Sequence, residues 1–308
     1  MLQIVVLGSA AGGGFPQWNC NSEACRNARA GDALARTQSS IAVSGDGRHW
    51  FLFNASPDLR QQINATPQLH PNHGLRTSPI AGVVLTNADV DHVAGLLTLR
   101  ESTPWVLYAS ERVLATLKAN SIFNALNPEF VERRPLVLGE TFEPVTPAGE
   151  KAGLAVEAFP VPGKVALYLE DPDAGPNFGT QEGDTVGVKV TSLDGDTHFF
   201  YIPGCAEMTP DLAGRLRNAP LALFDGTLWK DDEMIAAGIG VKTGRRMGHM
   251  SMSGEDGTIA AFRDLGVERR VFIHINNSNP TLLDGTPERR EVEAAGWEIG
   301  FDGMEVTL

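Results

Sequence analysis

The sequence Thr-Asn-Ala-Asp-Val-Asp-His at residues 86–92 decides how this chain is interpreted. The apolar residues 80–85 before it predict a buried strand, and residues 93–99 after it have helical character. Side chains at such a strand-to-helix turn project from the carboxyl edge of a sheet, where open α/β layers place their chemistry. In the alternative interpretation, Asp and Asn only form a turn and cap the helix, and the histidine only packs. This stretch alone leaves both interpretations open.

The composition indicates an ordinary globular protein. The chain has 308 residues, 42% hydrophobic and 20% charged, which is typical of a folded domain. A net charge of −13 argues against nucleic acid and anionic membranes as partners. No apolar run approaches the roughly 20 residues of a membrane span, and residues 1–7 predict a first strand rather than a signal peptide. Three cysteines suggest no disulfide framework, so we expect no membrane insertion and a cytoplasmic location.

Polar residues recur near the ends of predicted strands in both halves of the chain. Two β-hairpins are predicted, with turns at residues 44–48 and 192–196. The polar residues at strand ends are Asn54, Asp89, Asp91, His92, Asp225, His249 and His274. A duplicated β-sandwich with helices outside would bring these ends to one edge. We therefore expect two similar halves, about residues 1–150 and 151–308.

Three other segments add expectations about the backbone. Residues 8–14 form a glycine-rich turn after the first strand, but their G-x-x-x-G-G-G spacing differs from the G-x-G-x-x-G of dinucleotide folds. We expect these glycines to let the backbone pass close to a buried site. Strands are also predicted at residues 164–170 and 270–275, the second with His274 near its carboxyl end.

These residues carry a family resemblance. Residues 86–92 with Ala94-Gly95-Leu96 resemble the metallo-β-lactamase superfamily signature T-H-x-H-x-D-H-x-x-G-L, and Gly248-His249 and residues 272–274 resemble its late G-H element and closing histidine strand. The resemblance implies one domain over residues 1–308. Its expected fold class is α/β (α+β), a metallo-β-lactamase-like αββα sandwich of two mixed sheets flanked by helices.

A narrower resemblance rests on four further segments. They are Leu-Gly-Ser-Ala-Ala-Gly-Gly-Gly at residues 7–14, Pro-Gln-Trp-Asn-Cys at 16–20, Arg-Thr-Gln-Ser-Ser at 36–40 and Asn-Ala-Ser-Pro-Asp-Leu at 54–59. Together they are similar to the B family of pyrroloquinoline quinone (PQQ) synthesis proteins. This resemblance implies a small-molecule partner, PQQ or its precursor.

The chain departs from the superfamily signature at its metal ligands. Asn87 and Asp89 replace the two leading histidines, residues 161–164 contain no histidine, and residues 204–205 contain no aspartate. Without these groups, a two-metal site that activates a bridging hydroxide is hard to build.

The retained ligands are Asp91, His92 and His274. Two histidines and one carboxylate with open positions are typical of non-haem Fe(II) oxygenases, although zinc also binds such a set. We therefore expect Fe(II), with zinc or another divalent metal an alternative in purified protein.

Other polar residues are assigned to the pocket. Asp89 could be a further ligand or accept a hydrogen bond from a ligand imidazole. His249 is a candidate for catalysis and proton transfer, and Asn87, Lys164 and Asp225 are candidates for substrate binding. The structural alternatives are a core histidine for His249, a cap for Asp225 and an exposed lysine for Lys164.

A second metal site is considered at Cys20 and Cys25. The family's knuckle is usually C-x-C-x-x-C, and here Ser22 replaces the middle cysteine. The two thiols could hold a structural zinc, or they could be reduced, partly buried cysteines.

Three functions follow from the resemblance. The first is an iron-dependent hydroxylase that adds oxygen to the tyrosine ring of a cross-linked Glu-Tyr precursor of PQQ. The second is a carrier that binds PQQ or its precursor for transport towards the periplasm. The third is a metal-dependent hydrolase, which the missing ligands disfavour. The chain could also form a homodimer.

Overall fold

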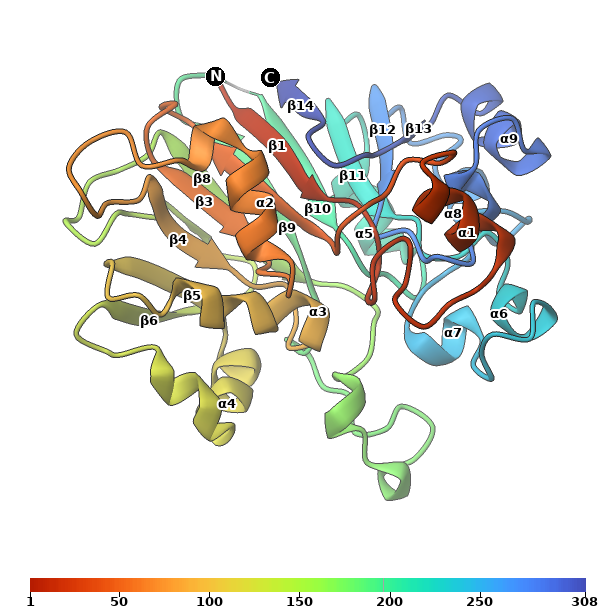
Figure 1. The fold of residues 1–308 in the computed structure, drawn as a ribbon, viewed down its shortest axis with the longest axis horizontal. Helices are drawn as coiled ribbons and strands as arrows, with labels where there is room; N and C mark the ends of the chain where they lie inside the picture. The colour runs from red at the N-terminus through yellow and green to blue at the C-terminus, as the bar shows by residue number, and fades with distance from the viewer. Residues whose placement is uncertain (196) are drawn as a thin grey trace.

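The computed structural model describes residues 1–195 and 197–308. Two β-sheets pack face to face, and helices cover both outer faces (Figure 1). This is the αββα sandwich that the sequence predicts. Residue 196, in the turn of the second predicted hairpin, lies outside the described residues.

The first sheet has the strand order β14-β1-β2-β3-β4-β5-β6. β1 pairs antiparallel with β14 and β2, β2 pairs antiparallel with β3, and β3 to β6 are parallel. The strands are β1 (Gln3–Gly8), β2 (Ser40–Ser44), β3 (Trp50–Phe53), β4 (Ile80–Val84), β5 (Trp105–Ser110), β6 (Val131–Leu136) and β14 (Glu305–Thr307).

The second sheet repeats this pattern in the order β13-β12-β11-β10-β9-β8-β7. β7 to β10 are antiparallel, and β10 to β13 are parallel. The strands are β7 (Thr141–Phe142), β8 (Leu154–Pro160), β9 (Val186–Ser192), β10 (His198–Ile202), β11 (Leu221–Asp225), β12 (Arg269–Ile273) and β13 (Glu298–Ile299). β7 precedes the expected midpoint of the chain, and β14 returns to the first sheet.

Helices complete the outer layers. The α-helices are α1 (Glu23–Ala30), α2 (Leu59–Ala65), α3 (Val90–Val93), α4 (Glu111–Ala119), α5 (Pro210–Leu216), α6 (Glu233–Ala236), α7 (Gly244–Met247), α8 (Thr258–Ala261) and α9 (Pro287–Ala294). The 3-10 helices are η1 (Pro67–Leu69), η2 (Ala94–Leu99), η3 (Ser121–Ala125), η4 (Leu167–Leu169), η5 (Pro172–Ala174) and η6 (Pro280–Leu282). In the described part of the chain, no helix has the length and apolar character to cross a membrane.

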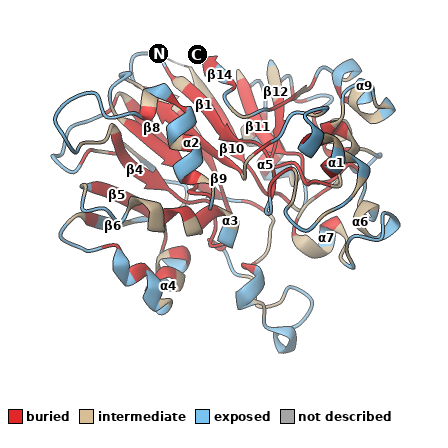
Figure 2. Ribbon diagram, viewed as in Figure 1, coloured by how far each residue is buried: buried red, intermediate tan, exposed pale blue. Residues whose placement is uncertain are grey.

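Three apolar clusters explain why the strands are apolar on both faces. One cluster lies between the sheets, where Phe51 of β3 and Phe199 of β10 are fully buried. The other two lie beneath the helices, as with Leu117 of α4 and Val292 of α9. Figure 2 shows the buried strands between half-exposed helices. Strands covered on both faces need no polar alternation.

Two strand predictions need correction. Residues 164–170 form a loop and η4 rather than a strand, because tertiary contacts fix this segment outside either sheet. β12 ends at Ile273, and His274 leaves the strand with a φ of 55°. The left-handed region is uncommon for a residue other than glycine.

The turn after β4 is fixed between the two sheets. The carbonyl of Thr86 accepts a hydrogen bond from the amide of Val186 in β9 at 2.8 Å. The side chain of Asn54, which follows β3, accepts from the Thr86 amide at 2.9 Å and donates to the Thr86 hydroxyl at 2.9 Å. It also donates to the hydroxyl of Tyr201 in β10 at 3.4 Å. Asn54 is fully buried, so this position carries polar contacts that both sheets share.

We expect Asn54→Ala to lower the free energy of unfolding by about 2–4 kcal/mol, because buried partners lose their hydrogen bonds. Asn54 has a φ of 65°. Asn54→Gly should therefore be less destabilised than Asn54→Ala, by about 1 kcal/mol, since glycine accepts this conformation without strain. Urea denaturation of the three proteins measures both differences. Equal stability of the alanine variant and the parent would contradict the role of Asn54.

Candidate metal centre

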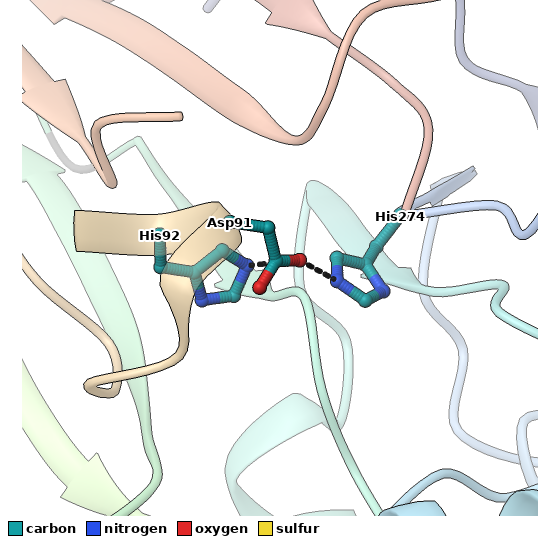
Figure 3. Close-up of side chains that lie close together, drawn as sticks. All are labelled: Asp91, His92 and His274. Atoms are coloured by element: carbon teal, nitrogen blue, oxygen red, sulfur yellow. Dashed lines mark hydrogen bonds and ion pairs between the residues drawn. The ribbon is translucent and has the colours of Figure 1, made fainter. Parts of the chain in front are cut away.

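Asp91, His92 and His274 meet at the carboxyl edge of the sandwich (Figure 3). Asp91 and His92 lie on α3, which begins shortly after β4 ends. His274 directly follows β12 of the other sheet. The strand-end pattern in the sequence therefore does bring residues of the two halves together, as predicted.

The three side chains direct donor atoms towards one point. The Nε2 atom of His274 lies 3.2 Å from Oδ2 of Asp91, and Nε2 of His92 lies 3.9 Å from the same oxygen. The two imidazole rings are 5.4 Å apart and nearly perpendicular, at 71°. One ligand atom from each residue falls within 4.8 Å of the others. Two nitrogens and one oxygen in this arrangement suit a divalent transition metal.

The second nitrogen of His92 indicates how its ring is oriented. Nδ1 of His92 lies 2.7 Å from Oδ1 of Asn87, which also accepts the backbone N–H of Asp89 at 3.0 Å. This atom must be the amide oxygen, because a backbone N–H can only donate. His92 therefore carries its proton on Nδ1, and its buried Nε2 has no hydrogen-bond partner in the described residues. The lone pair of Nε2 is therefore buried without a hydrogen-bond donor among these residues, and it is free to bind a metal ion.

The protonation states of Asp91 and His92 also suit a metal. Burial lowers the pKa of His92 to about 4, although Asp91 opposes this shift. Burial alone would raise the pKa of Asp91, but His92 and His274 hold it well below its ordinary value. At neutral pH the site thus presents a neutral imidazole at His92 and an ionised carboxylate, the forms that bind metals.

Asp89 lies beside these ligands but is not one of the convergent group. Its Oδ1 accepts the backbone N–H of Leu167 at 3.3 Å. Burial and the neighbouring charge of Asp91 raise the pKa of Asp89. Asp89 thus connects the metal-site turn to the segment that contains η4.

A second group, Asp225, His249 and His274, lies next to the first. Here Nδ1 of His249 lies 2.7 Å from Oδ2 of the fully buried Asp225. The ring of His249 stacks on that of His274 at 5.2 Å and 20°. The oxygens of Asp225 also accept the backbone N–H groups of Thr227 and Cys205 at 2.9 Å. The second group is therefore joined by more hydrogen bonds than the first. Burial lowers the pKa of His249, but Asp225, together with the charges of Asp89 and Asp91, raises it, and the net shift is upward.

One cavity of about 340 Å³ joins these groups. Its lining includes the convergent ligands Asp91, His92 and His274, and Asn87, Asp89 and His249 as well. Apolar side chains from Leu167, Met234 and Met247 contribute to the wall. The predicted pocket residues therefore share one cavity, except Asp225, which lies behind His249.

Lys164 lines the same cavity but already has a partner. Its Nζ lies 2.6 Å from Oε1 of Glu170, and Arg246 binds both oxygens of Glu170 at 2.9 and 2.6 Å. The side chain of Lys164 is only 15% exposed, so the alternative of an exposed lysine is wrong. Lys242 also lines the cavity and has no ion pair within the described residues.

The segment that contains Glu170 projects from the sandwich (Figure 1). Lys164 and Leu167, which precede Glu170, line the cavity. Besides Glu170, the hydroxyl of Tyr168 secures the segment by donating to the carbonyl of Ala88 at 2.8 Å. The guanidinium of Arg246 lies 3.8 Å from the centre of the Phe178 ring. These contacts fix the segment against the metal-site turn and α7.

Cys20 and Cys25 form no metal site with other residues in the described chain. The hydroxyl of Ser22 lies 3.3 Å from Sγ of Cys20 and accepts the backbone N–H of Cys25 at 3.3 Å, as the N-cap of α1. Both cysteines are free thiols. A structural zinc at this position stays a prediction.

Residues 204–205, where the superfamily has a bridging aspartate, supply no carboxylate. Cys205 is buried and its Sγ donates to the carbonyl of Glu207 at 3.2 Å. Burial raises the pKa of this thiol to about 12. Gly204 faces the cavity without a side chain.

Thr227 and Lys242 also line the cavity. The sequence did not indicate either residue, because neither belongs to a metal-ligand pattern. It did anticipate a close approach by the glycine-rich turn. A Cβ at Gly12 would lie 3.4 Å from Oδ2 of Asp91. The turn therefore passes directly beside the ligand carboxylate.

Comparisons with known proteins agree with this geometry. A model of the beta-lactamase superfamily domain matches residues 49–275. Coenzyme PQQ synthesis protein B of Bradyrhizobium diazoefficiens is 57% identical over 310 residues, and that of Gluconacetobacter diazotrophicus is 59% identical over 310 residues, each with 100% coverage of both chains. This chain belongs to the coenzyme PQQ synthesis protein B family. The family resemblance predicted from the sequence is confirmed.

A solved structure of the same family has a closely similar fold. Zn²⁺-bound PqqB from Methylobacterium extorquens matches with a TM-score of 0.94 and 52% identity, over 99% of this chain and 100% of that chain. The expected metallo-β-lactamase-like architecture is therefore confirmed over almost the whole length.

The contacts of Glu170 predict the behaviour of the projecting segment. We expect Glu170→Gln to speed amide hydrogen exchange in residues 165–181 by about 5–30-fold, since about 1–2 kcal/mol of local stability is lost. Hydrogen exchange with mass spectrometry measures this change. Glu132→Gln is the control, because Glu132 forms a similar pair with Arg134 on β6 but is 56% exposed. Unchanged exchange in the first variant would contradict the contact's importance.

The same ion pairs predict a pH dependence. Arg246, followed by Lys164, holds the pKa of Glu170 at about 2, below its ordinary value of 4.5. This stabilisation is fully present above pH 4.5 and is lost as the pH falls through about 2.

Proposed function

We propose that this protein acts in PQQ biosynthesis as a mononuclear, iron-dependent hydroxylase of the tyrosine-derived ring of the Glu-Tyr precursor. The convergence of Asp91, His92 and His274, with one carboxylate and two imidazoles, carries the proposal. The family name supports the pathway. A carrier for PQQ or its precursor is an alternative that the reaction test below distinguishes.

Asp91, His92 and His274 would hold the metal. When bound, Fe(II) would supply the activation of O₂ at open coordination positions. The Zn²⁺-bound relative supports a divalent metal here, and the same ligands accept zinc or iron. Two observations favour one metal over the two of a hydrolase. Lys164 and Cys205 stand where the superfamily has metal ligands, and their side chains bond to Glu170 and to the carbonyl of Glu207. Asp225 and His249 bond to each other.

His249 would hold and move a proton beside the substrate. Asp225 accepts from its Nδ1, which leaves Nε2 as the atom available for exchange. Hydroxylation inserts one atom of O₂ into a ring C–H bond, and the other atom leaves as water. That balance needs two protons and two electrons, and a small-molecule reductant supplies the electrons.

The cavity also fits an aromatic acid. Leu167, Met234 and Met247 offer apolar contact to a ring, and Lys242 offers a cation without a partner in the described residues. Lys164 shares its charge with Glu170. We therefore expect Lys242 to bind one carboxylate of the substrate. Lys164 would lie nearby and contribute less, because Glu170 already pairs with it. Asn87 orients His92, so any substrate contact would use its amide nitrogen.

The reaction has a direct test. The protein is loaded with Fe(II) without oxygen and then given the cross-linked Glu-Tyr precursor, ascorbate and O₂. We expect one metal per chain and a product heavier by one oxygen atom. When ¹⁸O₂ is supplied, that added atom should be ¹⁸O. His274→Ala should lose this product, because it removes a ligand.

Three outcomes would contradict the hydroxylase. Unchanged substrate mass with a fully loaded metal site would exclude the reaction. Tight binding of PQQ that persists in Asp91→Ala and His274→Ala, without turnover, would support the carrier. Two metals per chain would support a hydrolase.

Substrate binding has a separate test at Lys242. We expect Lys242→Met to raise KM about tenfold, equivalent to roughly 1.4 kcal/mol, with little change in kcat. A raised KM with unchanged kcat shows the loss of an interaction that binds the substrate and the transition state equally well. Lys230→Met is the matched control, since Lys230 is exposed and does not line this cavity. Equal KM values for the two variants would remove Lys242 from the substrate site.

A further inference from the structure

Thr227 lies behind the metal ligands and contacts both histidines of the second group. Its hydroxyl oxygen lies 2.8 Å from Nδ1 of His274 and 3.1 Å from Nδ1 of His249. It is also 2.6 Å from Oδ1 of Asp225. Thr227 is only 4% exposed, so water does not compete freely for these contacts.

The bonds of Asp225 determine the direction of the hydroxyl. Oδ1 accepts the backbone N–H of Thr227 at 2.9 Å, and Oδ2 accepts the backbone N–H of Cys205 at 2.9 Å and Nδ1 of His249 at 2.7 Å. A carboxylate surrounded by donors is ionised and can only accept. The Thr227 hydroxyl has two possible acceptors, Oδ1 of Asp225 at 2.6 Å and the carbonyl of His274 at 3.0 Å. Its single hydrogen points to Asp225, which is closer and carries the negative charge.

The direction of the hydroxyl determines the tautomer of His274. With its hydrogen given to Asp225, the oxygen of Thr227 can only accept from Nδ1 of His274. Nδ1 of His274 must then carry a proton. Nε2, the nitrogen that remains to bind the metal, lies 3.2 Å from Oδ2 of Asp91.

We propose that Thr227 is a positioning residue that fixes His274 in the Nδ1–H tautomer and so prepares its Nε2 to bind the metal. The inference rests on the proposed metal site. Asn87 plays the corresponding part for His92, with an amide oxygen in place of a hydroxyl. Each histidine ligand is thus held by an oxygen that accepts from Nδ1.

The backbone of Thr227 is fixed independently of its hydroxyl. Its carbonyl accepts the amide of Asn276 at 3.0 Å, and the adjacent Gly226 amide donates to the carbonyl of Ile273 at 2.8 Å. These bonds join the segments that follow β11 and β12. Thr227→Val keeps the shape and these bonds but removes the hydroxyl, and Thr227→Ser keeps the hydroxyl.

The tautomer is observable without metal or turnover. In metal-free protein labelled with ¹⁵N-histidine, long-range ¹H–¹⁵N correlation spectra report which nitrogen carries the proton. We expect the Nδ1–H form at His274 in the parent and in Thr227→Ser. We expect a shift towards the Nε2–H form in Thr227→Val. His92 is the internal control and should remain Nδ1–H in every variant.

Metal affinity gives the second readout. Competition with a chelator for Zn²⁺ should show about 10–100-fold weaker binding for Thr227→Val, and near-parental binding for Thr227→Ser. An Nε2–H form at His274 in the parent would overturn the proposal, whether or not the variants fold. Parental tautomer and Zn²⁺ affinity in Thr227→Val would also overturn it. Neither measurement needs the hydroxylase reaction, so failure of the proposed reaction leaves this test intact.

Discussion

The site depends on how the turn after β4 is held between the two sheets. Thr86 bonds through its carbonyl to Val186 of the second sheet and through its amide to Asn54 of the first. A buried amide and hydroxyl would be costly without partners, so the two sheets can pack closely here in only one register. That register places Asp91 and His92, on the helix that follows β4, near His274, which follows β12 of the other sheet.

The residues that surround the candidate metal position form hydrogen bonds with one another, although several superfamily ligands are missing. Asn87 stands where the signature has a histidine, but its oxygen orients the remaining ligand His92. Asp225 and His249 bond to each other beside the ligands. The residues around the metal position thus restrict the ring orientations of the ligands. Such restriction reduces the reorganisation needed for metal binding.

The sequence was sufficient to predict the sandwich, the family and the convergence of the three candidate ligands. Strand ends in an αββα sandwich share one edge, so polar residues at those ends could be grouped before the structure was known. Residues 164–170 were wrongly predicted because Val165, Leu167 and Leu169 alternate as in a strand. Their actual course depends on ion pairs of Glu170 with Lys164 and Arg246. Thr227 could not be found, because threonine carries no ligand signal and its role depends on three-dimensional hydrogen bonds.

The position of β14 has a consequence for how the chain reaches this structure. β1 is synthesised before β14, and one of its edges is covered only when residues 305–307 pair with it. Throughout synthesis, the first sheet therefore keeps an open row of backbone donors and acceptors beside Gln3 and Val5. Open edges of this kind invite pairing with other chains, and such distant contacts form slowly. The two halves resemble each other in strand order, yet the first half cannot complete its sheet without the end of the second.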